Sequence, residues 1–376
     1  MLKVMTIVGT RPELIKMSRV IAELDINTKH VLVHTGQNYD YELNQLFFED
    51  LDIRKPDHFL EAVGDNAAQT IARVIEKSDE VMGQEKPDAV MLYGDTNSCL
   101  AVISAKRRKI PVFHMEAGNR CFDQRVPEEL NRKVLDHLSD INLVLTEHAR
   151  RYLIAEGVRP ETVIKTGSHM REVLDYYMPK IQASEVLSCM RLEQGCYFIV
   201  SMHREENVDT PQNLTDLLHT LNALAERYQI PVIVSTHPRT QKRLDALNLG
   251  KLDSRIQFLK PFGFCDYVKL QMEALCVVSD SGTITEEGSL LNLPAVTIRN
   301  AHERPEGMDV GTLIMAGLRK EHVLDAVRVI IAQHERGIRV IAPVDDYESP
   351  SVSKKILRIV LSYTGYVNRN VWRKDF

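Results

Sequence analysis

The residues best suited to chemistry are four carboxylates in the segment HMEAGNRCFDQRVPEELNR, residues 114–132. The segment follows the apolar run IPVF, which the sequence predicts to be a buried strand. Glu116 therefore comes directly after a strand, where an unpaired carboxylate would be costly. Glu128 and Glu129 open a predicted helix, and successive helical residues point about 100° apart. We expect one of this pair to face a site and the other to pair with an arginine.

Other polar residues follow other predicted strands. Asp95 lies in GDTNS, where either Asp95 or Thr96 could simply cap a helix. His203 lies in MHREEN; a lone histidine is more often structural, but Arg204 beside it suits a phosphate. His237, in THPRT, is a further candidate.

The motif GTRPE, residues 9–13, has the pattern of a capping box that starts a helix. Arg11 lies in the first turn, where the helix dipole disfavours a cation unless an anion docks there. Lys16 could contact the same anion or could be a solvated lysine.

The motif DSGTITEEG, residues 280–288, predicts a strand, a turn and a helix start. It can also be explained as a capping box, but the Ser281-Gly282 turn would expose backbone N–H groups to an anion. Glu287 could then accept from ribose hydroxyls, and Arg304 in ERPEG could contact a phosphate.

The elements that position these residues are apolar runs alternating with amphipathic helical patterns, which predicts α/β folding with parallel sheets. Because open parallel sheets bind ligands at the carboxyl ends of their strands, the polar segments are expected to gather there. The chain length of 376 residues fits two domains, and no clear strand occurs at 169–192. We expect domains at 1–168 and 169–350, with a C-terminal helix in 351–376 packing on the first. The expected strands are 3–8, 30–35, 89–93, 111–115, 141–145, 163–166, 197–201, 231–235, 256–259, 276–279 and 295–298.

Composition excludes several classes of protein. A net charge of −5 provides no basic field for nucleic acid. The six cysteines lack CxxC spacing, which favours reduced thiols in a cytoplasmic protein and no zinc site. No apolar run is long enough for a membrane span. The N-terminal apolar run is predicted to be a strand and not a signal peptide. Neither GxGxxG nor a P-loop occurs, which disfavours nicotinamide and kinase-type sites, and no residue pattern indicates a metal.

The order of the motifs resembles the non-hydrolysing UDP-N-acetylglucosamine 2-epimerase family. The motifs extend from Gly9 to Gly307 in the family's order: GTRPE, GDT, EAG, PEE with NR, HREEN, DSG with EE, and ERPE. The resemblance implies a GT-B architecture, with two Rossmann-like doubly wound domains and a nucleotide-sugar in the interdomain cleft. It also implies a homodimer that needs no cofactor. The implied catalytic positions are Asp95, Glu116, Glu128 and His203, and the implied UDP-binding positions are Arg11, Ser281, Gly282, Glu287 and Arg304. The residue patterns add Lys16, Arg204 and His237 to the candidate UDP-binding residues.

A narrower resemblance concerns HTGQNYDYELNQLFF, EAGNRCFDQRVPEELNRK and NAHERPEGMDVGT. These segments look like the branch that converts UDP-2-acetamido-2,6-dideoxy-L-talose to UDP-N-acetyl-L-fucosamine for capsule or O-antigen synthesis. In bacterial UDP-N-acetylglucosamine enzymes, the region of GQNYDYEL helps to bind a second, activating substrate molecule, and we do not expect that activation here. HREEN and SGT also depart from the commoner HRRES or HRREN and SGG.

The C2 hydrogen of such a sugar has very low acidity, so inversion without a redox cofactor calls for loss of UDP to a 2-acetamidoglycal and re-addition. Asp95, Glu116 and Glu128 would jointly transfer protons at the two faces of C2, while His203 and Arg11 would support charge on UDP. Three alternatives stay open: a UDP-N-acetylglucosamine/UDP-N-acetylmannosamine 2-epimerase, a GT-B glycosyltransferase, and a catalytically silent UDP-sugar sensor.

Overall fold

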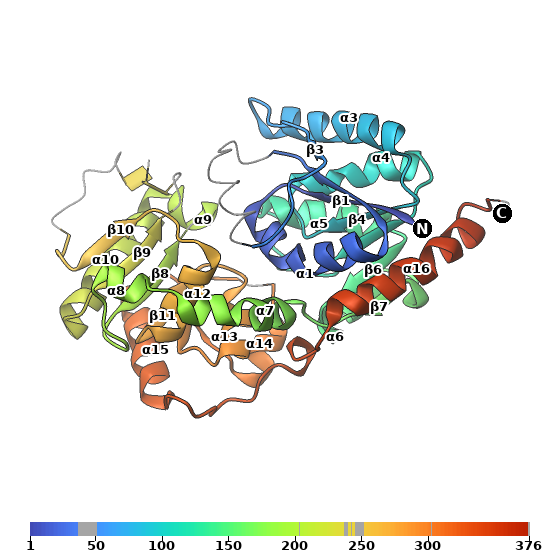
Figure 1. Ribbon diagram of the computed structural model, residues 1–376. Helices are drawn as coiled ribbons and strands as arrows, with labels where there is room; N and C mark the ends of the chain where they lie inside the picture. Colours follow the sequence, from blue (N-terminus) through green and yellow to red (C-terminus); the bar gives the residue numbers. More distant parts are fainter. Residues whose placement is uncertain are drawn as a thin grey trace. The chain divides into compact units, whose positions relative to one another are not determined.

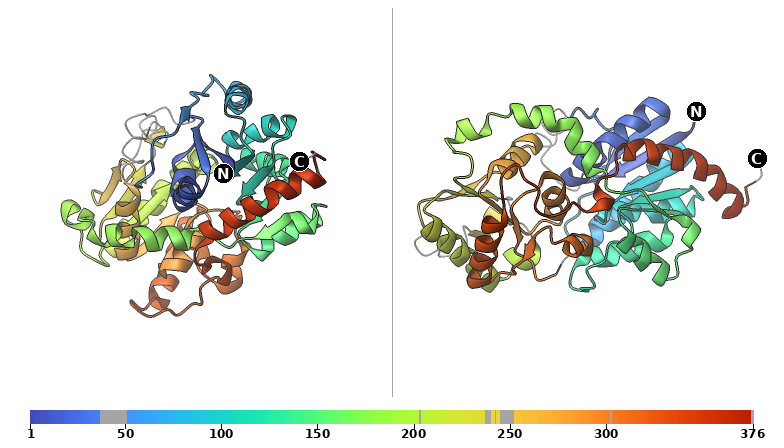
Figure 2. Two further views of the ribbon diagram at one scale, coloured as in Figure 1. Left: turned by 45° about the vertical axis from the view of Figure 1, so that its right-hand side comes forward. Right: turned by 90° about the horizontal axis from the view of Figure 1, so that it is seen from below.

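The computed structural model describes residues 1–36, 51–202, 204–236, 240–241, 243–244, 252–301 and 303–374. The chain divides into two compact units (Figures 1 and 2). Unit 1 comprises Met1–Asp175 and Asp345–Phe376, and unit 2 comprises Tyr176–Val344. The sequence placed these boundaries at 168 and 351. The first boundary instead falls between Asp175 and Tyr176, inside the helix α7 (Met170–Ala183), which contributes residues to both units.

Unit 1 contains a seven-stranded parallel sheet in the order β3-β2-β1-β4-β5-β6-β7. Its strands are β1 (Lys3–Val8), β2 (Lys29–His34), β3 (His58–Phe59), β4 (Ala89–Tyr93), β5 (Val112–Met115), β6 (Ile141–Val144) and β7 (Val163–Lys165). Its helices are α1 (Arg11–Asn27), α3 (Ala67–Glu85), η1 (Asn97–Ala101), α4 (Val102–Arg107), α5 (Pro127–Leu138), α6 (Glu147–Ala155), η2 (Pro160–Thr162), η3 (Asp345–Tyr347) and α16 (Val352–Asn370). In unit 1, α16 lies beside α1, so the C-terminal segment packs on the first domain as expected (Figure 1).

Unit 2 contains a six-stranded parallel sheet in the order β10-β9-β8-β11-β12-β13. Its strands are β8 (Phe198–Met202), β9 (Val232–Thr236), β10 (Ile256–Leu259), β11 (Cys276–Ser279), β12 (Ala295–Thr297) and β13 (Ile314–Met315). Its helices are α8 (Val186–Met190), α9 (Glu205–Val208), α10 (Pro211–Tyr228), α12 (Phe264–Glu273), α13 (Ile284–Leu291), α14 (Pro305–Val310) and α15 (Lys320–Gln333).

The strand orders confirm two doubly wound parallel sheets. All eleven expected strands form, each within one residue of its expected limits at either end. The central strands are almost wholly apolar and buried, as expected when helices cover both faces of a parallel sheet. Strands β3 and β13, which have two residues each and lie at sheet edges, were not predicted, because such short runs have no periodicity of their own.

Each sheet has one point where its strand order reverses direction. In unit 1 this point lies between β1 and β4, and in unit 2 between β8 and β11. Ligands of open α/β sheets bind outside the carboxyl ends of the strands at such a point. The segments that follow these four strands begin at Gly9, Gly94, residue 203 and Asp280, and they contain most of the candidate residues.

Two expectations from composition can be compared with the structure. All six cysteines are free thiols. Within the part of the chain that the structure describes, no helix is both long and apolar enough to cross a membrane.

Candidate active site

Glu116 is the centre of a polar cluster in unit 1. It follows β5, and its Oε2 accepts a hydrogen bond from Lys16 Nζ at 2.8 Å and another from the hydroxyl of Tyr93. Asn119 Nδ2 lies 3.3 Å from Oε1. The donors come from α1, from the end of β4 and from the turn after β5, so tertiary folding creates the cluster. Lys16 is buried in this ion pair and is not the solvated lysine that the sequence left open.

The turn that carries Glu116 has an unusual backbone. Glu116 itself has φ +64°, a left-handed conformation that is uncommon for a residue with a side chain and is often found at functional sites. Buried Asp136 of α5 anchors this turn: its carboxylate accepts from Gly118 N at 3.2 Å and from Arg120 at 2.7 Å. His114 Nδ1 lies 2.9 Å from the same carboxylate, and its Nε2 lies 2.8 Å from the carbonyl oxygen of Gly94. The network therefore connects the turns after β4 and β5.

Asp95, in the turn after β4, is held by α5. Arg132 donates to Asp95 Oδ2 at 2.8 Å and to Glu129 Oε2 at 2.9 Å. Glu129 also accepts from the backbone N–H groups of Cys121 and Phe122. Burial alone would raise the pKa of Glu129, but the Cys121 N–H and the Arg132 charge lower it by stabilising the carboxylate. Glu129 is thus the member of the glutamate pair that binds an arginine, as expected for one of them, and Glu128 is half-buried.

The expected capping box at the start of α1 is present. Glu13 Oε2 accepts from Gly9 N at 2.6 Å and Thr10 N at 3.2 Å, and its Oε1 accepts from the hydroxyl of Thr96 at 2.6 Å. Burial raises the pKa of Glu13 to about 7, and nearby Asp95 adds to the effect. Glu13 is therefore more than the predicted cap, because its carboxylate also connects the turn after β1 to the turn after β4. Arg11 is half-buried at the first position of α1.

The turn after β11 is the corresponding feature of unit 2. Asp280 is fully buried, and its Oδ2 accepts from the backbone N–H of Arg204 at 3.0 Å and from Asn207 at 3.1 Å. The Ser281 hydroxyl lies 3.0 Å from that of Thr283, the residue before α13. The predicted strand, turn and helix start are therefore present, and Asp280 joins them to the segment after β8.

Three arginines surround this turn. Arg299 forms a double hydrogen bond with Glu303 at 2.6 and 2.8 Å, and Arg204 lies 3.7 Å from the same carboxylate. Arg304 pairs with buried Glu286 at 2.8 Å. A small hollow is lined by Ser281, Gly282, Arg299, Glu303 and Arg304 together with neighbouring apolar side chains. Planar guanidinium groups around a helix start are suited to a phosphate.

Glu287 is buried in α13 and its Oε2 accepts from Gln271 at 2.8 Å. Two of the candidate residues, His203 and His237, lie outside the described residues, as does most of the GQNYDYEL segment.

Several residues of these clusters were not predicted from the sequence, among them Tyr93, Arg132, Arg299 and Glu303, and Glu13 was predicted only as a cap. Tyr93 was counted as the last residue of a strand, yet the final side chain of a strand at the reversal point can reach the site. Glu13 and Arg132 lie about one helical turn from candidate residues, whereas Arg299 and Glu303 lie in the segment after β12, and only the fold shows that they join these clusters.

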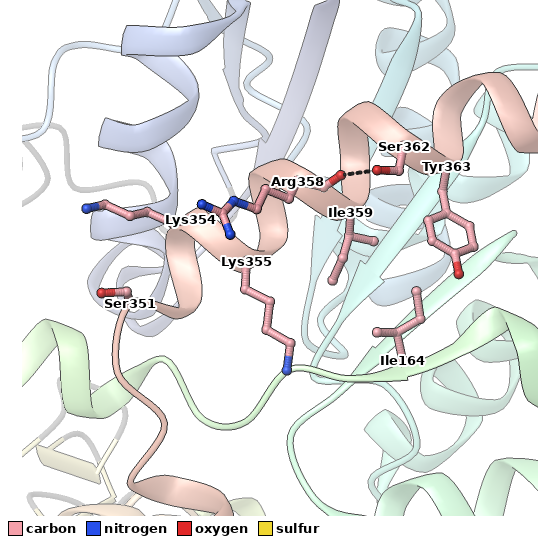
Figure 3. Close-up of a pocket in the computed structure, with 8 residues that line it drawn as sticks. All are labelled: Ile164, Ser351, Lys354, Lys355, Arg358, Ile359, Ser362 and Tyr363. Carbon is pink, nitrogen blue, oxygen red and sulfur yellow. Dashed lines mark hydrogen bonds between the residues drawn. The ribbon is translucent and has the colours of Figure 1, made fainter.

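A separate hollow of about 400 Å³ lies beside α16 in unit 1 (Figure 3). Three cations line it, Lys354, Lys355 and Arg358, and its lining includes no carboxylate. Lys355 donates to the backbone oxygen of Lys165 at 2.5 Å. The hollow lies along a helix and not at the carboxyl ends of the central strands, so we place the candidate chemistry elsewhere. Among the described residues, no group of His, Cys, Asp and Glu could hold a metal ion.

Two Rossmann-like parallel-sheet units define an α/β protein of the GT-B type. A UDP-glucosyltransferase from Polygonum tinctorium has the same fold, with a TM-score of 0.61 and 12% identity over 96% of this chain and 98% of that one. At that identity the likeness concerns the fold alone.

The family model for UDP-N-acetylglucosamine 2-epimerase matches residues 22–361, and the chain belongs to this family of isomerases. A UDP-N-acetylglucosamine 2-epimerase of Methanococcus maripaludis is 34% identical over 346 residues, which cover 88% of this chain and 92% of that protein. A UDP-2,3-diacetamido-2,3-dideoxy-D-glucuronate 2-epimerase of Pseudomonas aeruginosa is 32% identical over 338 residues, covering 88% and 93%.

Solved structures agree with this assignment. A UDP-N-acetylglucosamine 2-epimerase structure from Rickettsia bellii has 62% identity and a TM-score of 0.95, with full coverage of both chains. The Methanocaldococcus jannaschii enzyme in complex with UDP-N-acetylglucosamine and UDP has 31% identity and a TM-score of 0.88, covering 96% of this chain and 100% of that one.

Proposed function

We propose that this enzyme inverts C2 of a UDP-linked 2-acetamido sugar. The observation that carries the proposal is the pairing of Glu116 with Lys16 and Tyr93 at the strand-order reversal of unit 1. A carboxylate held by a cation and a phenol at a ligand-binding edge is suited to proton transfer. Unit 2 supplies an arginine-lined helix start that is suited to the diphosphate of UDP.

The reaction needs no change of oxidation state overall. A base removes the proton from C2, the C1–O bond breaks, and UDP leaves with the bonding electrons to yield a 2-acetamidoglycal. An acid then protonates C2 from the opposite face while UDP adds back to C1. We assign these proton transfers jointly to Asp95, Glu116 and Glu128, whose environments differ.

The diphosphate is assigned to Arg204, Ser281, Gly282 and Arg304, with His203, His237 and Arg11 supporting the charge that develops on UDP. Glu287 is assigned to the ribose hydroxyls. Lys16, which we expected at the phosphate, contacts Glu116, so we assign it to stabilising that carboxylate.

For the sugar we propose UDP-2-acetamido-2,6-dideoxy-L-talose, with UDP-N-acetyl-L-fucosamine as product. The support is the branch-like segments that include EAGNRCFDQRVPEELNRK and NAHERPEGMDVGT. We further propose a cytoplasmic homodimer that supplies capsule or O-antigen synthesis. The second candidate substrate pair is UDP-N-acetylglucosamine and UDP-N-acetylmannosamine, which is favoured by the names of several relatives.

The decisive experiment follows H2 of the sugar by NMR in deuterated water. UDP-N-acetyl-L-fucosamine and UDP-N-acetylglucosamine are incubated with the protein in parallel. We expect loss of H2 and appearance of the talo epimer with the first compound. Exchange only with the second would replace the substrate but keep the mechanism. Absence of exchange in both, with UDP still bound, would indicate a sugar transferase or sensor instead.

A further inference from the structure

The contact between Tyr93 and Glu116 goes beyond the residues assigned above. Tyr93 is the last residue of β4, with 3% of its surface exposed, and its hydroxyl donates to Glu116 Oε2. Lys16 Nζ contacts the same oxygen at 2.8 Å. A phenol and an ammonium group therefore share one oxygen of a carboxylate that we place in proton transfer.

The ring of Tyr93 is held from several sides. His169, which precedes α7, packs against it edge to face, with the ring centroids 5.3 Å apart. Lys16 Nζ lies 5.5 Å from the ring centroid, within the range of a cation–π contact. Cys99 donates to the carbonyl oxygen of Tyr93 at 2.8 Å, and Gly94 N donates to Met115 O at 3.0 Å across the two strands. The ring and backbone of Tyr93 are thus held by α1, by the residue before α7, by η1 and by the neighbouring strand, and together these fix the position of the hydroxyl.

A purely structural role is the simplest alternative, because a buried tyrosine hydroxyl usually needs a partner. Tyr197 in unit 2 shows what such a role looks like: it is equally buried, and its hydroxyl donates to the carbonyl oxygen of Leu270 at 2.7 Å. Tyr93 instead donates to an ionisable group on a turn with a left-handed backbone. A hydrogen bond to a charged group is stronger than one to a carbonyl.

We infer that Tyr93 is a positioning residue for Glu116, whose hydroxyl fixes the carboxylate in the orientation needed for proton transfer at C2. The inference rests on the proposed function and adds a residue to it. Tyr93 itself forms no covalent bond and undergoes no change of oxidation state. As the carboxylate gains and loses a proton, the hydroxyl keeps Oε2 in place together with Lys16.

The test compares Tyr93→Phe with Tyr197→Phe, since each removes one buried hydroxyl and keeps the ring. We expect Tyr93→Phe to lower kcat about tenfold to a hundredfold, the effect of losing a hydrogen bond to a charged group, with little change in KM. Tyr197→Phe should keep kcat near the wild-type value. Equal kcat values for the two variants would overturn the inference.

A double-mutant cycle adds a readout that a general structural defect would not produce. In the Glu116→Gln background, Tyr93→Phe should cause little further loss of C2 proton exchange. If the fold-loss of C2 exchange in the double variant equals the product of the two single-variant losses, Tyr93 acts independently of Glu116. That result would also overturn the inference.

If Tyr93→Phe fails to fold, 3-fluorotyrosine at position 93 keeps the ring and makes the phenol a stronger donor. The titratable groups that contact Tyr93 include Glu116 at its hydroxyl, Lys16 and His169 at its ring, and Cys99 at its backbone carbonyl. We expect the pH profile of C2 exchange to shift, and a profile that coincides with the wild-type one would contradict the inference. Wild-type exchange tests the proposed function separately: absent exchange rejects both ideas, whereas intact exchange with an unaffected Tyr93 variant rejects only this one.

Discussion

At the scale of single residues, the carboxylates of unit 1 differ in their partners. Glu116 is held by Lys16 and Tyr93, whereas Asp95 is held by Arg132. Glu13 is buried among uncharged donors, and its pKa is raised to about 7 by that burial. Groups of one chemical type that are kept in different environments can serve as acid and base in the same reaction.

Glu116→Gln keeps the size of the side chain but removes its ability to accept a proton. We expect kcat for C2 exchange to fall by about a hundredfold to ten-thousandfold, the usual contribution of a general acid or base. UDP affinity, measured by calorimetry, should stay near the wild-type value. The control is Glu161→Gln, in an exposed ion pair with Arg159. Near-normal turnover of Glu116→Gln would remove Glu116 from the mechanism.

The arginines of unit 2 differ in how much their removal would destabilise the fold. Arg304 forms a buried pair with Glu286, and its removal would leave a buried carboxylate without that partner and destabilise the fold. Arg204 is more exposed and lies at the edge of the Ser281-Gly282 turn. We expect Arg204→Gln to weaken UDP binding about tenfold through loss of a charge-assisted contact. Arg243→Gln, which breaks an exposed pair with Asp209, is the control, and equal UDP affinities for the two variants would exclude Arg204 from the site.

At the scale of elements, the site depends on turns that follow the central strands. The turn after β5 is anchored by Asp136 of α5, and the turns after β1 and β4 are joined by Glu13. Helix α5 also places Arg132 against Asp95. One helix and one capping residue thus set the relative positions of the candidate catalytic groups within unit 1.

Gly118→Ala tests how tightly the Glu116 turn is packed. Gly118 has φ +81°, and a Cβ there would lie 2.6 Å from the carbonyl oxygen of Ala149 in α6. We expect the free energy of unfolding to fall by about 3 kcal/mol, from backbone strain plus the clash. Gly157→Ala is the matched control: it has φ +89° but nothing within 4 Å, so a loss of about 1 kcal/mol is expected. Similar losses in urea unfolding would show that the packing against Ala149 does not constrain the turn.

Glu13→Gln tests the junction of the turns after β1 and β4 through its pH dependence. The folded protein raises the pKa of Glu13 from 4.5 to about 7, so it binds this proton more tightly than the unfolded chain does. The resulting stabilisation, up to about 3 kcal/mol, is full below the unfolded pKa and is lost as the pH rises through 7. The free energy of unfolding of the wild type, measured in urea, should therefore fall as the pH rises from about 5 to about 8. Glu13→Gln should remove this slope of the free energy of unfolding against pH, and Glu23→Gln on the same helix is the control. An unchanged slope in Glu13→Gln would assign the pH dependence to other groups.

At the scale of the whole molecule, the chain leaves unit 1 within α7, forms unit 2, and returns at Asp345. The returning segment ends in α16, which lies beside α1 and buries an apolar face that includes Ile356 and Val360. The most distant parts of the sequence therefore complete the same unit.

Ile356→Ala tests whether the returning helix is part of the core of unit 1. Ile356 is fully buried, so we expect a loss of about 2–5 kcal/mol in the free energy of unfolding. Leu361→Ala on the same helix is the control, since half of that side chain is exposed and a small loss is expected. Equal thermal unfolding temperatures for the two variants would mean that α16 contributes little to unit 1.

The sequence alone was enough to predict the element types and to place candidate residues after particular strands. Local patterns were sufficient for the central strands and the capping box of α1, because periodicity and capping depend on residues close in sequence. The start of α13 was also predicted, although Thr283 makes no side-chain cap hydrogen bond there. The same patterns predicted that Asp95, Glu116 and Ser281 follow strands, and Asp95 and Ser281 follow strands at the reversal points.

Which of these groups meet depends on contacts between segments that are distant in sequence. Lys16 and Glu116 are 100 residues apart in sequence, and Tyr93 joins them from a third element, so no local pattern could reveal their contact. The edge strands β3 and β13 and the change of unit inside α7 were missed for the same reason. Pairing and packing between distant segments set them, and a short run or a continuous helix has no local signal for either.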